Sequence, residues 1–246
     1  MSCSQRSAKA DVGGSIRLRE LALLRQGAYR LLATTFLYPN PERIQTVSLL
    51  AASLGEASHP FAEFSFWIQW KRLLAALWGL RDTDRAALEA AYVPNFMVSS
   101  EAALCGAYES AHVEKEATGR VLAELDREYA RAGLLLAEVC PDPPDHIAVE
   151  LEFMSVLCGG EAEAWRRKAV DDAAAQLERE ARFLGRHLGW WLPEFASTVA
   201  RHDPDSLYAI ATDAAWAFVS HEKDLVATLL TRFQRLAAER SSGGDR

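Results

Sequence analysis

The residue types best suited to chemistry stand together in one short stretch, where His146 and Glu150 are four positions apart. On a helix this spacing places both side chains on one face, where an imidazole and a carboxylate can touch. Such a pair could bind a metal ion or act as a base assisted by a carboxylate. A structural interpretation is also open, because Asp145 can cap a helix that begins here and complement its dipole.

A metal site at His146 and Glu150 would need further ligands, and the sequence has neither an HExxH motif nor a close pair among its four cysteines. Glycine-rich phosphate loops and a GxSxG motif are also missing from it. A protein-binding function is therefore favoured, and we expect no catalytic residue, no metal and no cofactor. The alternatives are a small metal-dependent helical enzyme that uses His146 and Glu150, and a helical structural subunit retained in a larger complex.

A second candidate group is formed by Tyr108, Glu109 and Ser110. It lies at the end of residues 93–112, where proline, glycine and serine interrupt the helical periodicity. Long connections inside compact domains are often functional. By themselves, these three residues are equally consistent with an exposed turn that carries a half-buried tyrosine.

The elements that must position these groups are predicted to be helices. The chain holds 42 Ala and 32 Leu, against 27 Val, Ile and Thr together, and this balance favours helices over sheets. Apolar residues recur at steps of three and four along most of the chain. This pattern predicts about ten helices, over 20–35, 41–54, 61–80, 82–92, 113–132, 145–157, 161–188, a short one from Pro193, 205–218 and 225–236.

The fold class that follows is all-α, with a single helical-bundle domain over residues 15–240. We expect disordered tails at 1–14 and 241–246, because both ends are polar and rich in small residues. The net charge of −7 disfavours nucleic acid and anionic membrane surfaces as partners. No apolar run is long enough to span a membrane, and the first 14 residues lack the apolar core of a secretory signal. We therefore expect a cytoplasmic protein without stable membrane insertion.

The order of several motifs resembles the family of molybdoenzyme maturation chaperones that includes TorD, DmsD and NarJ. The strongest motif is PDHIAVELEFM at 144–154, in which Pro and Asp precede His and a Glu-Leu pair follows one turn later. Three other segments are similar to family segments in the same order: the opening at 29–39, the Tyr-Glu-Ser at 108–110, and the Phe-Leu-x-x-His-Leu-x-x-Trp stretch at 183–191. The resemblance covers about residues 20–235.

The sequence departs from the family pattern at three places near these motifs. Gly106-Ala107 stand where the family often has prolines, Ala111-His112 where an aromatic residue is common, and Pro144 where a second acid often precedes the Asp-His pair. These changes leave the expected fold intact and affect the local contacts of the expected binding groove.

The resemblance implies a TorD-like, system-specific chaperone of the cytoplasm. Such proteins bind the N-terminal twin-arginine leader or the apo form of a molybdenum oxidoreductase catalytic subunit. They hold it until the cofactor is inserted, before export or assembly. The Tyr-Arg-Leu-Leu-Ala opening is similar to that of chaperones for selenate, chlorate, dimethyl sulfide and ethylbenzene oxidoreductases. We expect a monomer or a domain-swapped dimer, because the proline-rich hinge at 142–144 could let two copies exchange helices.

A leader with a basic start and an apolar helix would be complemented by an acidic groove lined with apolar side chains. In this hypothesis Glu109 or Glu150 pairs with a leader arginine, and Tyr108 packs against the leader's apolar part. The expected client-binding residues are Tyr108, Glu109, Ser110, Asp145, His146 and Glu150.

Overall fold

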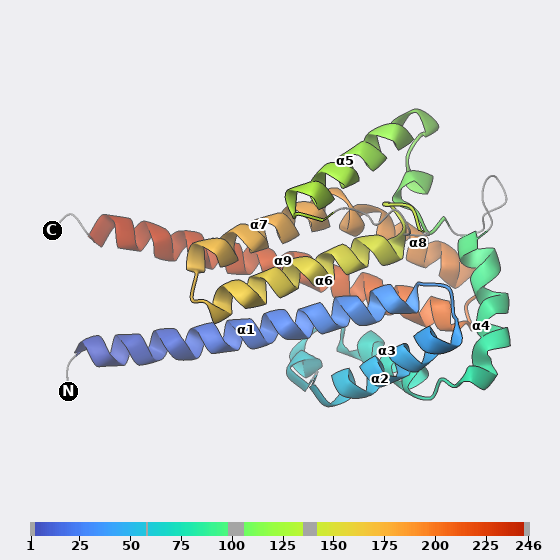
Figure 1. Ribbon diagram of the computed structural model, residues 1–246, viewed down its shortest axis with the longest axis horizontal. Coiled ribbons are helices and arrows are strands. Elements are labelled where there is room, and N and C mark those ends of the chain that lie inside the picture. The colour runs from blue at the N-terminus through green and yellow to red at the C-terminus, as the bar shows by residue number, and fades with distance from the viewer. Residues whose placement is uncertain (1–2, 58, 98–105, 135–141, 244–246) are drawn as a thin grey trace.

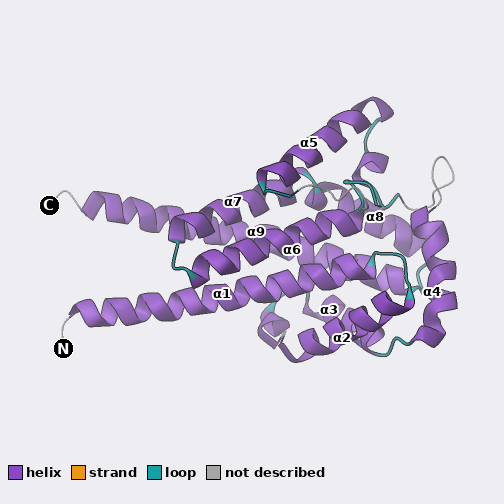
Figure 2. Cartoon of the chain, viewed as in Figure 1, coloured by secondary structure: helices purple, strands orange, loops and turns teal. Residues whose placement is uncertain are grey.

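A computed structural model of the chain describes residues 3–57, 59–97, 106–134 and 142–243, and the fold is built from helices (Figures 1 and 2). Within these ranges there are nine α-helices: α1 Cys3–Thr35, α2 Pro41–Ala57, α3 Trp67–Trp78, α4 Arg85–Tyr92, α5 Thr118–Arg131, α6 Ile147–Arg166, α7 Val170–Arg186, α8 Leu188–His202 and α9 Leu207–Gly243. Five single turns join them, at His59–Glu63, Asp82–Asp84, Val93–Met97, Glu109–His112 and Lys115–Ala117. No strand occurs in the described ranges, so the predicted all-α class is confirmed.

Helices α1, α6, α7 and α9 form a long bundle, and the two ends of the chain project from the same end of it (Figure 1). Helices α2 and α3 pack beside α1 and α9, whereas α8 packs against α9. Helix α5 extends away from the bundle at an angle (Figure 1). No helix in the described part of the chain is both long enough and apolar enough to cross a membrane.

Aromatic rings fill the core between the bundle and α3. The ring of Phe218, on α9, lies 4.9 Å from that of Tyr29 on α1, and 5.6 Å from that of Trp70 on α3. All three side chains are fully buried. A smaller apolar cluster around Ala22 and Trp165 joins α1, α6 and α7 further along the bundle.

A buried group of charges also joins the four bundle helices. Arg25 of α1 donates hydrogen bonds to Glu161 of α6 (2.6 Å), to Glu180 of α7 and to Glu222 of α9 (2.8 Å). None of the four side chains is more than 2% exposed. Burial raises the pKa of Glu180 to about 8, although the charge of Arg25 opposes that shift. Because three carboxyl groups share one guanidinium, this acid remains protonated near neutral pH.

The prediction of a helix that ends at residue 157, before a pair of glycines, is wrong, because α6 continues through Gly159 and Gly160 to Arg166. A Cβ atom on Gly159 would lie 2.6 Å from Nε2 of Gln26 on α1, and one on Gly160 would lie 3.0 Å from Nε2 of Gln176 on α7. The two glycines therefore make room for the glutamines of neighbouring helices. The signal that we interpreted as a helix stop reflects close helix packing.

Other helix boundaries also differ from the predictions. The stretch 161–188 is divided between α6 and α7, and the break contains Lys168 with a left-handed φ of 59°. Helix α8 begins before Pro193, and one helix, α9, replaces the two predicted after residue 205. Helical structure enters the ranges 1–14 and 241–246, where we expected disordered tails. The tails and the domain limits derived from them remain predictions.

Candidate functional site

The two sequence-predicted groups meet where the turn at Glu109–His112 packs on the start of α6. Tyr108 and His146 form an isolated antiparallel bridge. On either side of it, the backbone N–H of Glu109 donates to the carbonyl of Asp145 (2.9 Å), and that of Ile147 donates to the carbonyl of Ala107 (3.0 Å). The structure thus brings together the six residues that we predicted as one site.

The first turn of α6 is capped by His146, where we expected Asp145. Its Nδ1 accepts a hydrogen bond from the backbone N–H of Ala148 at 3.3 Å. The carboxylate of Asp145 instead accepts the backbone N–H of Ser110 at 3.1 Å. Burial lowers the pKa of His146, which favours the neutral imidazole that can accept this bond.

The geometry that a metal enzyme would need is missing from the described residues. No hydrogen bond joins the side chains of His146 and Glu150 there, because the imidazole is engaged with the backbone and the carboxyl group faces Trp191. No group of three or more His, Cys, Asp or Glu residues in the described ranges is placed to hold a metal ion. The pair therefore has structural roles at the start of α6.

The carboxylate of Glu109 lies inside the protein, with 2% of the residue exposed. Its Oε2 accepts a hydrogen bond from Nδ1 of His187 at 2.9 Å. Its Oε1 accepts one from Nε1 of Trp190 at 2.8 Å. Both donors come from the start of α8, so Glu109 fastens the turn at Glu109–His112 to that helix.

A second carboxyl group, that of Glu150, lies beside Glu109 and is fully buried. Its Oε2 accepts a hydrogen bond from Nε1 of Trp191 at 3.2 Å, whereas its Oε1 has no hydrogen-bond partner among the described residues. Burial, and then the charge of Glu109, raise the pKa of Glu150 well above its ordinary value. Burial thus favours the protonated form of Glu150.

The surface above these carboxyl groups is aromatic. Trp190 is 38% exposed, and Tyr108 and Ser110 are partly exposed. The hydroxyl of Tyr108 donates to the carbonyl of Phe96 at 3.3 Å, which holds its ring 5.1 Å from that of His146. Of the six predicted residues, Glu109, Asp145, His146 and Glu150 are thus buried and Tyr108 and Ser110 reach the surface.

Three residues of α8 and its cap were missed as parts of this site: His187, Trp190 and Trp191. The sequence did contain a signal, because two of them lie in the Phe-Leu-x-x-His-Leu-x-x-Trp stretch that carries the family resemblance. The two tryptophans lack a charged group that would have marked them as parts of this site. Their indole N–H groups in fact donate hydrogen bonds to the two buried carboxyl groups, Trp190 to Glu109 and Trp191 to Glu150.

Two residues that depart from the family pattern, Gly106 and His112, contact each other. Gly106 has a positive φ of 47°, and a Cβ atom there would lie 2.9 Å from the Cβ of Ala111. Its carbonyl lies 2.9 Å from Nε2 of His112, whose ring packs 5.2 Å from that of Trp191. Glycine at 106 and histidine at 112 therefore work together to fold this turn tightly onto α8.

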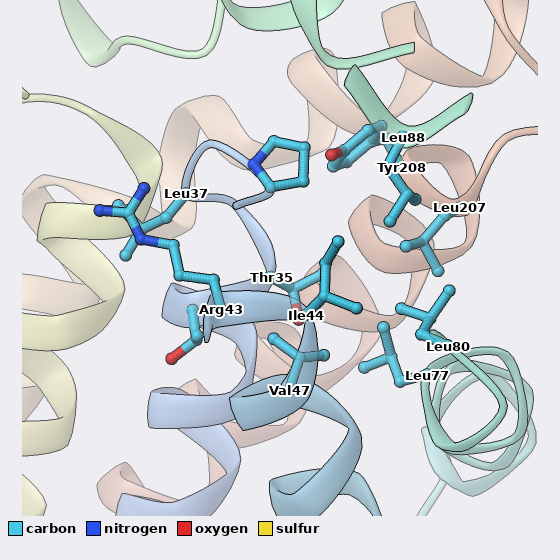
Figure 3. Close-up of a pocket in the computed structure, with 12 residues that line it drawn as sticks. Thr35, Leu37, Arg43, Ile44, Val47, Leu77, Leu80, Leu88, Leu207 and Tyr208 are labelled. Atoms are coloured by element: carbon cyan, nitrogen blue, oxygen red, sulfur yellow. The ribbon is translucent and has the colours of Figure 1, made fainter. Parts of the chain in front are cut away.

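An apolar pocket is lined by residues that include Leu207 and Tyr208 of α9 (Figure 3). Leucine, isoleucine and valine side chains, from α2, α3, α4, α9 and the segments that follow α1 and α3, form most of its lining, and Arg43 is the one charged residue among them. Nη1 of Arg43 donates to the carbonyl of Tyr38 at 3.0 Å. The ring of Tyr208, which lines the pocket, lies 4.9 Å from Phe96.

Comparison with known proteins identifies the family. The model of the family described as nitrate reductase delta subunit matches residues 63–197, which span the turn at Glu109–His112, the start of α6 and most of α8. The chain belongs to this family. TorD and NarJ chaperones are its members, as the resemblance in the motifs implied.

Members of the nitrate reductase delta subunit family with similar sequences are named as chaperones. The selenate reductase assembly chaperone of Thauera selenatis is 32% identical over 192 residues, which cover 74% of this chain and 84% of that protein. The chlorate reductase assembly chaperone of Ideonella dechloratans is 31% identical, over 65% of this chain and 78% of that protein. The TorD chaperone of Vibrio cholerae is 28% identical, over 65% and 72%.

A solved structure supports the fold. A protein of Archaeoglobus fulgidus described as a redox enzyme maturation protein matches 79% of this chain and 93% of its own, with a TM-score of 0.50 and 23% identity. The family is one of chaperones and has no enzymatic activity. The alternative hypothesis of a metal-dependent enzyme built on His146 and Glu150 is therefore set aside.

Proposed function

We propose that this chain is a cytoplasmic assembly chaperone for the catalytic subunit of a molybdenum oxidoreductase. It binds the twin-arginine leader of that subunit, its apo form, or both, and holds it until the cofactor is inserted. The observation that carries the proposal is the 32% identity with a selenate reductase assembly chaperone over 84% of that protein's length. The partner is thus a reductase subunit that leaves before export or assembly is complete.

The acidic site supports recognition of a basic leader. Glu109, Asp145 and Glu150 place three carboxyl groups within a few side chains of one another, and His187 is the one basic side chain bonded to them among the described residues. A site with more acidic than basic groups favours a cation. Arginine fits best, because its planar guanidinium can donate two parallel hydrogen bonds to one carboxylate.

The aromatic surface supports recognition of the apolar part of a leader. Tyr108 and Trp190 are both partly exposed, and the indole N–H of Trp190 bonds to the carboxylate of Glu109. Aromatic rings of this kind contribute large contact areas at low cost in side-chain entropy. In the proposal, Tyr108 and Ser110 contact the client directly, and Asp145 and His146 hold the turn and the start of α6 in place.

The test is calorimetric titration of the protein with a synthetic leader from the molybdoenzyme encoded beside it, with a twin-lysine leader for comparison. We expect saturable binding that weakens with the lysine leader. Replacing Glu109 and Glu150 together by Gln should weaken binding of the arginine leader by roughly 10- to 100-fold, because a hydrogen bond to a charged group contributes about 1.5–3 kcal/mol.

The matched control is Glu152→Gln, which removes an exposed carboxylate from the same helix and should leave the affinity unchanged. Far-UV circular dichroism checks that the helix content of each variant survives. Unchanged affinity of the double variant would show that neither carboxyl group contributes to binding of the leader. A chain that stayed bound to the mature enzyme after cofactor loading would indicate a retained subunit and contradict the chaperone role.

A further inference from the structure

The carboxylate of Glu109 is already occupied in the free protein, in a way that imitates an arginine. Oε1 accepts the indole N–H of Trp190 at 2.8 Å, and Oε2 accepts an imidazole N–H of His187 at 2.9 Å. One donor on each oxygen is the arrangement that a bidentate guanidinium makes with a carboxylate. A client arginine therefore has to compete with two donors from the chaperone itself.

The two internal donors differ in how easily they can leave. His187 is 2% exposed, its backbone N–H is bonded to the carbonyl of Phe183 at 2.9 Å, and its ring packs against that of Phe183. Trp190 is 38% exposed, and its indole N–H bonds only to Glu109 among the described residues. Rotation of one side chain is enough to withdraw Trp190, whereas withdrawal of His187 would disturb the α7–α8 junction.

The surroundings favour a cation in the place that Trp190 would vacate. Glu150 lies beside Glu109, close enough for the two carboxyl groups to interact, and its buried Oε1 has no other hydrogen-bond partner among the described residues. A guanidinium on Glu109 would bring several N–H donors next to that oxygen, whereas the single N–H of an indole cannot serve both carboxyl groups. The site is therefore better satisfied with an arginine than with the tryptophan.

We propose that Trp190 is a built-in competitor for the client, whose indole N–H holds the carboxylate of Glu109 until a client guanidinium displaces it. This inference rests on the proposed function and assigns Trp190 a regulatory role in the same site. A client group that cannot donate an N–H hydrogen bond to Glu109 does not compensate for the bond lost from Trp190, so it binds more weakly. The competition therefore increases the preference for arginine. The return of Trp190 also assists release, because it gives Glu109 a partner when the client leaves.

The test is the affinity of the arginine leader for Trp190→Phe, which keeps an aromatic ring and removes the N–H group. We expect this variant to bind about fivefold to tenfold more tightly than the wild type, which corresponds to the ~1 kcal/mol of a typical hydrogen bond. Trp78→Phe is the control, because Trp78 is 70% exposed on α3 and should have no effect.

A second measurement needs no substitution at the site. In protein carrying ¹⁵N-labelled tryptophan, the indole N–H of Trp190 should exchange slowly with solvent in the free chaperone and faster when the leader is bound. Equal affinity of wild type and Trp190→Phe would overturn the inference and leave the chaperone proposal standing. Weaker binding by Trp190→Phe would overturn it too, since Trp190 would then be a client contact. Failure of the leader to bind either protein contradicts the proposed function itself.

Discussion

Replacing Arg25 by Met removes the one guanidinium that Glu161, Glu180 and Glu222 share at the centre of the bundle. Removing one partner of a buried ion pair costs about 3–5 kcal/mol, because it leaves the other charge buried without compensation. Here three carboxyl groups are left, and each can escape the cost only by taking up a proton. We therefore expect a loss of about 4 kcal/mol in the free energy of unfolding at pH 8, and a smaller loss at pH 6.

The direction of the pH dependence follows from the acids. Burial raises the pKa of Glu180 to about 8, and it also raises the pKa of Glu161, while Arg25 opposes both shifts. A folded-state pKa above the unfolded value stabilises the fold fully below the unfolded pKa, and this contribution is lost as pH rises through the folded pKa. Without Arg25 both pKa values rise further. The decline in stability with pH is then steeper, by up to about 1.4 kcal/mol per pH unit for each acid that Arg25 keeps ionised in the wild type.

Urea unfolding followed by far-UV circular dichroism at pH 6 and pH 8 measures the effect. Arg30→Met is the control, because Arg30 is an exposed arginine on the same helix and should change stability by less than about 0.5 kcal/mol. Adding Glu180→Gln to Arg25→Met should restore part of the loss at pH 8. A loss no larger than that of Arg30→Met, or equal losses at both pH values, would refute the reasoning.

Two further predictions concern α8 and the site. Gly189→Ala should destabilise the protein by about 1–3 kcal/mol, because the new Cβ would lie 2.4 Å from the carbonyl oxygen of Leu184. The control is Gly185→Ala on α7, whose new Cβ meets no atom within 4 Å. It should stabilise the protein by about 0.5–1 kcal/mol in the same urea series. Burial raises the pKa of Glu150 well above its ordinary value, so its contribution to stability declines as pH rises from the unfolded pKa. Glu150→Gln should therefore show a shallower fall in melting temperature from pH 6 to pH 8 than the wild type, and parallel curves would contradict this cause.

The fold class could be predicted from the sequence because helix formation depends on local composition and periodicity. The excess of Ala and Leu and the three–four spacing are properties of short windows, so they predicted helices that the structure confirms. The meaning of Gly159 and Gly160 could not be found in this way. It depends on Gln26 and Gln176, which approach from other helices.

That the six residues lie together could be predicted from the motifs, but their burial could not, and their part in client binding stays a prediction. Glutamate is usually exposed, so Glu109 and Glu150 were expected to face a groove directly. Their positions inside the protein depend on the indole groups of Trp190 and Trp191, which are distant in sequence and carry no charge. A sequence motif records which residues occur together, whereas a buried hydrogen bond depends on how separate helices are placed.

The bridge between Tyr108 and His146 has a consequence for how the chain can diversify. Hydrogen bonds between backbone groups of 107–109 and 145–147 close the base of the whole excursion that contains α5. Backbone bonds of this kind form with almost any side chain, so the two anchor points tolerate substitution. Because backbone groups close the excursion, we expect changes on the exposed face of α5 to leave the bundle in place, whereas Tyr129 of α5, which packs against Phe153 and Phe183, has to be kept.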